Sequence, residues 1–191
     1  MFQDFTAPPS GVAALTQHRI SQLRRHLSEA GLAALIVPRA DAHQGEYVAD
    51  CDERLAFLTG FSGSAGTAIV TRRKAALIVD GRYTLQARGQ LEGTRVEVVD
   101  FAADAAAKWI AANCRSGDAV GIDYGLITLA QAEQLIAALK QHGIRLKPTR
   151  GNLVDKVWGD ARPKPPADPV SVQPLRLAGQ SAKDKVASVQ K

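Results

Sequence analysis

Four consecutive residues, Asp80-Gly81-Arg82-Tyr83, place a carboxylate, a glycine, a guanidinium and a phenol directly after the apolar run 75–79. In α/β proteins the ends of strands commonly carry functional groups. Gly81 permits a tight turn, Asp80 is a candidate helix cap, and Arg82 would present a planar fork that suits carboxylate or carbonyl oxygens. The residues alone leave two interpretations open: Arg82 binds a ligand, or Arg82 pairs with Asp80 and fixes the turn.

The segment 60–66 is rich in glycine and hydroxyl side chains, and its glycines are Gly60, Gly63 and Gly66. This spacing is not that of a phosphate-binding loop, and no Gly-Lys-Ser/Thr sequence is present. The segment also precedes a predicted strand, whereas phosphate loops lead into a helix. We therefore predict a tight, buried turn in which backbone segments approach closely.

His43 and Cys51 lie in a segment with three aspartates and are candidates for a metal site or a nucleophile; the aspartates are Asp41, Asp50 and Asp52. A zinc site needs paired ligands at short spacing from two parts of the fold, and the other histidines lie on predicted helices or at a helix end. A Cys-His nucleophile also needs an orienting group and an oxyanion hole, for which the sequence offers no signal. The sequence thus predicts neither chemistry here.

The chain has 191 residues, of which 46% are hydrophobic and 23% charged, a composition typical of a soluble globular protein. No apolar run approaches the roughly 18–20 residues that cross a bilayer. Residues 1–5 lack the basic and apolar regions of a secretory signal, so we expect a cytoplasmic location. The two cysteines, Cys51 and Cys114, are expected to be reduced thiols because they form no disulfide framework.

The net charge of +5 comes from the C-terminal part of the sequence, since residues 1–139 carry −2 and residues 140–191 carry +7. A basic segment can bind phosphate backbones, rest on an acidic surface or simply be solvated. It lacks the interleaved aromatic residues with which proteins stack single-stranded bases. We therefore predict no nucleic-acid partner.

Hydrophobic patterning predicts alternating helices and strands up to about residue 148. The first helix covers residues 12–30, with Leu15, Ile20, Leu23 and Leu27 toward the core and Gly31 as its stop. The other predicted helices are 55–58, 83–91, 102–114 and 128–142, the last beginning at the N-cap candidate Thr128 and ending at Gly143.

The predicted strands are 32–37, 67–71, 75–79, 96–99, 120–123 and 144–148. The basic turn 72–74 joins two of them into an antiparallel hairpin, and intervening helices make the rest largely parallel. We therefore predict an α/β fold with a mixed β-sheet flanked by helices.

The composition changes after residue 160, where four prolines fall within residues 162–169. We predict a domain over 1–160, a stiff proline-rich linker over 161–180 and a helix over 181–191, beginning at Ser181. So short a helix is marginal by itself, and we expect it to open a second domain. The alternative is that it docks back on the first domain.

Four ordered motifs and the proline-rich linker resemble the N-terminal domain of the three-domain, cytosolic-type aminopeptidase P family, which consists of Xaa-Pro metalloaminopeptidases. The motifs occupy residues 41–47, 60–67, 80–87 and 152–158. The resemblance implies a creatinase/prolidase N-terminal fold, which is ribonuclease H-like, and a second domain of similar fold from Ser181. Gly45 and Thr84 depart from the usual family residues, which are Ser and Phe.

The resemblance also implies a function. These enzymes remove the N-terminal residue from peptides with proline second. They use two divalent metals, usually manganese, which two Asp, one His and two Glu hold on a C-terminal domain. We therefore expect no catalytic residue, metal or other cofactor in this chain and no activity of the chain alone. Arg82 is expected to contact the peptide, while Asp80, Gly81, Tyr83, His43, Gly60, Gly63 and Gly66 are motif residues with structural roles.

Three alternative functions remain open, the first of which rests on the resemblance. The first is a non-catalytic N-terminal domain that shapes substrate access and supports oligomerisation, with the middle and C-terminal domains and a second copy of the protein as partners. The second is an independent module that binds peptides or another protein. The third is a small enzyme that uses Cys51 or His43. No membrane partner is predicted.

Overall fold

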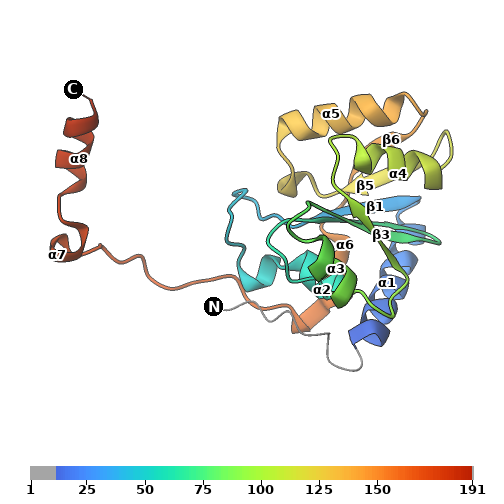
Figure 1. Ribbon diagram of the computed structural model, residues 1–191, viewed down its shortest axis with the longest axis horizontal. Helices are drawn as coiled ribbons and strands as arrows, with labels where there is room; N and C mark the ends of the chain where they lie inside the picture. The colour runs from blue at the N-terminus through green and yellow to red at the C-terminus, as the bar shows by residue number, and fades with distance from the viewer. Residues whose placement is uncertain (1–11, 191) are drawn as a thin grey trace.

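A six-stranded mixed β-sheet lies at the centre of the computed structural model, which describes residues 12–190 (Figure 1). The strands are β1 (Ala34–Pro38), β2 (Thr67–Thr71), β3 (Ala75–Val79), β4 (Val96–Asp100), β5 (Ala119–Ile122) and β6 (Arg145–Pro148), in the order β4-β3-β2-β1-β5-β6. The expectation about a secretory signal concerns residues 1–5, which lie outside the described residues. The predicted α/β class and mixed sheet are confirmed.

Strand β2 runs against both of its neighbours, β1 and β3, while all other neighbouring strands are parallel. Five strands therefore end at one edge of the sheet, which we call the carboxyl edge. The first residues beyond it are Arg39, Asp80, Phe101, Asp123 and Thr149. At the opposite amino edge the same five strands begin and β2 ends, so the turn 72–74 lies there.

Helices cover both faces of the sheet (Figure 1). One face packs against α1 (Val12–Glu29), α2 (Arg54–Thr59), α3 (Thr84–Gln90) and α6 (Leu153–Trp158), and the other against α4 (Ala105–Asn113) and α5 (Leu129–Lys140). Successive strand residues point to opposite faces, so Leu35 joins the first core and Ile36 the second. Three short 3₁₀ turns complete the domain: η1 (Asp50–Asp52), η2 (Tyr124–Leu126) and η3 (Gly159–Ala161).

Local sequence signals locate several elements well. Thr128 and Gln131 form a reciprocal capping box at the start of α5, and Gly143 follows the helix with φ +68°. The prediction was wrong for Leu15, which is 45% exposed. Thr16 is buried in its place, because its hydroxyl donates to the carbonyl of Thr59 at 3.0 Å.

Sequence patterning missed helix α6, which is only six residues long. Its N-cap Asn152 accepts a hydrogen bond from the backbone N–H of Val154, and its buried residues Leu153 and Val154 contact the α1 side of the core. The predicted helix over 102–114 begins later, since α4 starts at Ala105.

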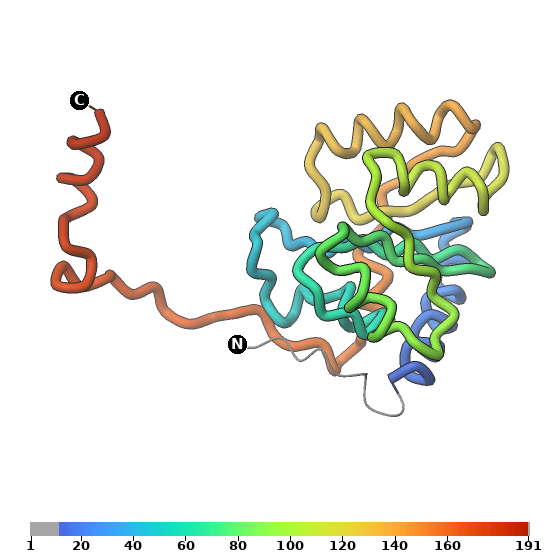
Figure 2. Tube along the Cα trace, viewed as in Figure 1, coloured from blue at the N-terminus to red at the C-terminus, as the bar shows by residue number. Residues whose placement is uncertain are grey.

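The segment after η3 leaves the domain in an extended path (Figure 2). Residues 163–174 contain no helix or strand, and two short helices follow, α7 (Leu175–Ala178) and α8 (Ala182–Val189). Ser181 caps α8 as predicted, by accepting a hydrogen bond from the backbone N–H of Asp184. Figures 1 and 2 show α7 and α8 away from the sheet.

Among residues 12–190 we find no helix with both the length and the apolar character that a membrane span requires.

Candidate functional site

The carboxyl edge brings together most of the residues that the sequence singled out. Arg39, Asp80 and Asp123 directly follow β1, β3 and β5, and parallel strands place such residues at one edge. Two hollows open here. One, of about 570 Å³, lies between α4, α5 and the ends of β1 and β5, and the other, of about 270 Å³, is lined by Asp80 and Phe101 among others.

Asp80 and Arg82 form an ion pair at this edge. Nε and Nη2 of Arg82 donate to the carboxylate of Asp80, the latter at 2.7 Å, and the backbone N–H of Arg82 donates at 2.9 Å. The side-chain hydrogen bond from Arg82 lowers the pKa of Asp80. Even so, the Arg82 side chain remains 73% exposed, and its Nη1 makes no hydrogen bond to the described residues. The guanidinium is thus both held and accessible.

Two details of this turn differ from the sequence prediction. Asp80 does not cap a helix, because Tyr83 occupies the N-cap position of α3 and Asp80 accepts from Arg82 instead. Gly81 is not required for the turn, because its φ is not positive and a Cβ atom there would meet nothing within 4 Å. The carboxylate of Asp80 and its carbonyl, which accepts from the N–H of Tyr83, fix the turn.

The glycine segment 60–66 packs directly beneath this turn. The hydroxyl groups of Ser64 and Tyr83 are hydrogen-bonded, and the Tyr83 ring meets the buried Phe61 ring edge-on at 5.9 Å. A Cβ atom on Gly63 would lie 2.2 Å from Phe61 Cζ and 2.8 Å from Tyr83 Cδ1. The backbone therefore approaches both rings so closely that only glycine fits.

The other two glycines of the segment have different roles. Gly60 ends α2 with φ +79°, in the left-handed region. A Cβ atom on Gly66 would lie 3.2 Å from both Leu55 and Phe61, which is tight but not a clash.

Arg39 is a residue of this edge that sequence reasoning missed. Its side chain is only 12% exposed and connects three segments. Nη2 donates to Glu53 at 2.8 Å, and Nη1 donates to the carbonyls of Glu46 and Ser64 at 3.0 and 3.1 Å. The sequence signal that could have identified Arg39 is its position directly after the apolar strand that ends at Pro38.

Asp41 holds the loop that contains His43. Its Oδ1 accepts hydrogen bonds from the backbone N–H groups of His43 at 2.9 Å and Gly45 at 3.0 Å. The bond from Gly45, followed by that from His43, lowers the pKa of Asp41 against the opposing effect of desolvation. Asp41 thus acts as a structural carboxylate, and His43 contributes its backbone N–H to the loop.

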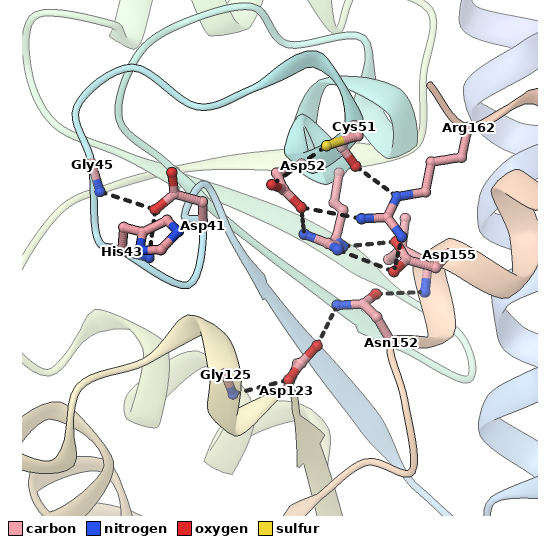
Figure 3. A network of polar contacts seen from close by, with 12 residues as sticks. Asp41, His43, Gly45, Cys51, Asp52, Asp123, Gly125, Asn152, Asp155 and Arg162 are labelled. Atoms are coloured by element: carbon pink, nitrogen blue, oxygen red, sulfur yellow. Dashed lines mark hydrogen bonds and ion pairs between the residues drawn. The ribbon is translucent and has the colours of Figure 1, made fainter. Parts of the chain in front are cut away.

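Cys51 and His43 do not form a joint site: Figure 3 shows them in separate clusters. Cys51 is 2% exposed, and its thiol donates to Asp52 at 3.6 Å. Burial raises the pKa of this thiol, which leaves it protonated and a poor nucleophile. Within the described part of the chain, no group of three or more His, Cys, Asp or Glu residues could hold a metal ion.

A partly buried charge network joins η1, α2, α6 and the start of the extended segment (Figure 3). Arg54 donates to Asp155 at 2.7 and 3.0 Å and to Asp52 at 2.8 Å. Arg162 contacts the same two carboxylates at 2.9 and 3.1 Å and donates to the carbonyl of Cys51 at 2.7 Å. Burial would lower the pKa of Arg54, but the hydrogen bonds and charge of Asp155, with those of Asp52, raise it overall.

Helix α6, which carries Asp155, is linked to the sheet edge through its N-cap Asn152, whose amide donates to Asp123 at 3.0 Å (Figure 3). Asp123 in turn accepts from the backbone N–H of Gly125. No local pattern could predict the contact between Arg54 and Asp155, because the two residues are 101 positions apart in the chain. At the carboxyl edge the hydrogen-bonded and accessible guanidinium of Arg82 is therefore suited to binding carbonyl or carboxylate oxygens.

The family model described as "Creatinase/Prolidase N-terminal domain" matches residues 19–157. Two curated fungal proteins named "Probable Xaa-Pro aminopeptidase P" are each 43% identical to 92% of this chain. The chain covers 29% of the Penicillium rubens protein and 27% of the Aspergillus flavus protein. It therefore spans less than a third of the length of these relatives.

Two solved structures give the same result for the fold. The X-prolyl aminopeptidase from Caenorhabditis elegans, described as a cytosolic enzyme with a di-nuclear active site, is 32% identical with a TM-score of 0.76. The match covers 91% of this chain and 30% of that one. The N-terminal domain of the peptidase PepQ from Mycobacterium tuberculosis is 24% identical with a TM-score of 0.58, covering 73% of this chain and 98% of that one. This second likeness concerns the fold alone.

Proposed function

Because the chain belongs to the creatinase/prolidase N-terminal domain family, we propose that it serves as the non-catalytic N-terminal domain of an Xaa-Pro aminopeptidase. Such an enzyme removes the N-terminal residue from peptides with proline in second position. The domain shapes the entrance through which the peptide reaches the catalytic residues. The 43% identity to proteins named for this activity supports the proposal.

The accessible guanidinium of Arg82 carries the proposal. Asp80 fixes one side of the guanidinium, and the other side remains open to solvent at the carboxyl edge. A fixed planar fork recognises carbonyl or carboxylate oxygens better than a flexible ammonium group does. Arg82 therefore binds an oxygen of the peptide while other residues of the parent enzyme cleave it.

The described residues do not fit a catalytic metal. The chemistry of a hard divalent ion calls for clustered oxygen ligands, and residues 12–190 contain no cluster that qualifies. We therefore place the two metals, with manganese as the expected ion, on a further part of the parent protein. The di-nuclear site in the description of the nematode relative, of which this chain covers 30%, supports that placement.

We also propose partners and a location for the parent enzyme. Middle and C-terminal domains of the parent enzyme follow the extended segment, the parent forms a homodimer, and the enzyme is cytoplasmic. The description of the nematode relative as cytosolic supports the location.

The test is Arg82→Ala in the full-length parent enzyme. Loss of a charged hydrogen bond, worth about 1.5–3 kcal/mol, should lower kcat/KM by roughly tenfold or more. Metal content and melting temperature should stay nearly unchanged, and Arg82→Lys should restore only part of the activity. Arg88→Ala, an exposed charge on α3, is the matched control and should leave the kinetics unchanged. Normal kinetics with a lowered melting temperature for Arg82→Ala would assign Arg82 to structure alone.

A second measurement separates this function from that of an independent binding module. The isolated chain should neither hydrolyse Xaa-Pro peptides nor bind manganese at micromolar concentration. Calorimetry with a proline-containing peptide gives the discriminating result. Affinity of the isolated chain equal to that of the parent enzyme would favour the independent module.

A further inference from the structure

Another concave surface lies at the amino edge, at the opposite end of the sheet from Arg82. It is a pocket of about 550 Å³ between the β2–β3 turn and the loop after α4. Four of its lining residues are cations, Arg72, Arg73, Lys74 and Arg115, and we call it the basic pocket. Its volume falls in the range of small-molecule sites, roughly 300–1,000 Å³.

The turn that carries three of these cations is held firmly. The hydroxyl of Thr71 accepts hydrogen bonds from the backbone N–H groups of Arg73 at 3.3 Å and Lys74 at 2.9 Å. The backbone N–H of Thr71 donates to the carbonyl of Lys74 at 2.8 Å. These hydrogen bonds hold the backbone of residues 71–74, so the turn keeps the three basic side chains next to one another.

Guanidinium groups at this edge are anchored to carbonyl groups rather than to carboxylates. Nε of Arg72 donates to the carbonyl of Leu32 at 3.3 Å, which leaves both Nη groups of Arg72 available. Nearby, Arg24 donates through Nε to the carbonyl of Thr71 at 3.0 Å. Neither guanidinium forms an ion pair with a carboxylate of the described residues.

Among residues 12–190 none of the four pocket cations forms an ion pair. Asp118 is the acidic residue in the pocket wall, and one of its oxygens accepts from the backbone N–H of Arg115 at 2.7 Å. Burial, and then the charge of Asp118, raise the pKa of the Cys114 thiol in the wall to about 11, so this thiol adds no negative charge near neutral pH. The pocket is therefore strongly positive.

We propose that the basic pocket binds the linked phosphate groups of a di- or triphosphate. Guanidinium forks pair with phosphate oxygens through two parallel hydrogen bonds, and an ammonium group adds a mobile point charge. The lining residues include no aromatic side chain on which a base could stack. Recognition therefore rests on the phosphate chain, whether it comes from a nucleotide or from inorganic polyphosphate. This site is independent of the proposed peptidase role.

Calorimetry of the 191-residue chain with sodium tripolyphosphate in low salt tests the site. The variant Arg73→Gln/Arg115→Gln removes two exposed charges that make no side-chain hydrogen bond to the described residues, so the fold should persist, as circular dichroism will check. We expect at least roughly tenfold weaker binding. The control Arg150→Gln/Lys164→Gln removes the same total charge elsewhere and should change the affinity less than about twofold.

Three further ligands make the test specific. ATP should bind about as tightly as tripolyphosphate, whereas AMP, with one phosphate, should bind at least roughly tenfold more weakly. Hexaglutamate, which has carboxylates in place of phosphates, should also bind more weakly. Lack of tripolyphosphate binding at millimolar concentration would overturn the site. So would equal binding of hexaglutamate or AMP, or equal weakening by the control variant.

Discussion

The two edges of the sheet handle positive charge in opposite ways. At the carboxyl edge Arg39 pairs with Glu53, Arg82 pairs with Asp80, and Arg54 pairs with two aspartates. At the amino edge the cations of the basic pocket have no carboxylate partner among the described residues. The first arrangement fixes loops in position, and the second leaves charge available to an external anion.

Removing a cation should therefore lower the free energy of unfolding strongly at the carboxyl edge and only slightly at the amino edge. Arg54→Ala should have the largest effect, because Asp52 and Asp155 would lose a cation whose side chain is only 7% exposed. Breaking such a pair typically costs about 3–5 kcal/mol, and the partial exposure of both aspartates favours the lower end.

Urea denaturation of the chain measures this difference. Arg73→Ala, at the amino edge, is the matched comparison and should change the free energy of unfolding by less than about 0.5 kcal/mol. Equal costs for Arg54→Ala and Arg73→Ala would contradict the contrast between the edges.

Packing at the carboxyl edge should show the next largest effect. Gly63→Ala would force a Cβ atom against the buried ring of Phe61 and the ring of Tyr83, which should cost about 1–3 kcal/mol. Gly81→Ala, in the neighbouring turn, meets open space and should be neutral or stabilising by up to about 1 kcal/mol. Thermal unfolding of the two variants checks the order. A Gly63→Ala protein more stable than the wild type would show that the rings of Phe61 and Tyr83 do not exclude a Cβ atom at position 63.

Acid should weaken the carboxyl edge selectively. Hydrogen bonds from the backbone N–H groups of Gly45 and His43 lower the pKa of Asp41 in the folded chain. A lowered folded pKa stabilises the protein above the unfolded pKa of about 3.9, and this stabilisation is lost as pH falls through the folded value.

The stability difference between the wild-type chain and Asp41→Asn should therefore be largest near neutral pH and shrink toward about pH 2.5. Melting temperatures at the two pH values measure it. Asp168→Asn, in the extended segment, is the control and should show no such trend. A difference that grows on acidification would show that the sign is wrong.

Salt should produce the smallest effect, and at the amino edge. Screening of the unpaired cations by about 0.5 M NaCl should raise stability by less than about 1 kcal/mol. The gain should be smaller in Arg73→Gln/Arg115→Gln, where two of the repelling charges are removed. An unchanged salt response in that variant would indicate that the amino edge carries no net repulsion.

Local sequence signals were enough to predict most elements of this fold. The hairpin β2–β3 was predicted with its observed bounds, because two apolar runs flank a short basic turn. The caps at Thr128 and Ser181 were predicted because each is a contact between residues only three positions apart. The motif 80–83 could be found for the same reason, since the Asp80–Arg82 pair forms within one turn.

Only the tertiary structure decided the long-range contacts. Arg54 and Asp155 meet because the parallel strands β1 and β6 bring the segments that follow them to one edge, and Arg39 meets Ser64 because β1 ends where the antiparallel β2 begins. No local pattern encodes these meetings. The net charge of the sequence could not predict the basic pocket, because its four cations lie within residues 1–139, which carry a net charge of −2. The net charge adds together residues that the fold places at opposite edges of the sheet. The amino edge can therefore be strongly positive although the sequence around its cations is slightly acidic. The sequence by itself determined where strands and turns begin, and the order and direction of the strands in the sheet determined which charges gather at each end.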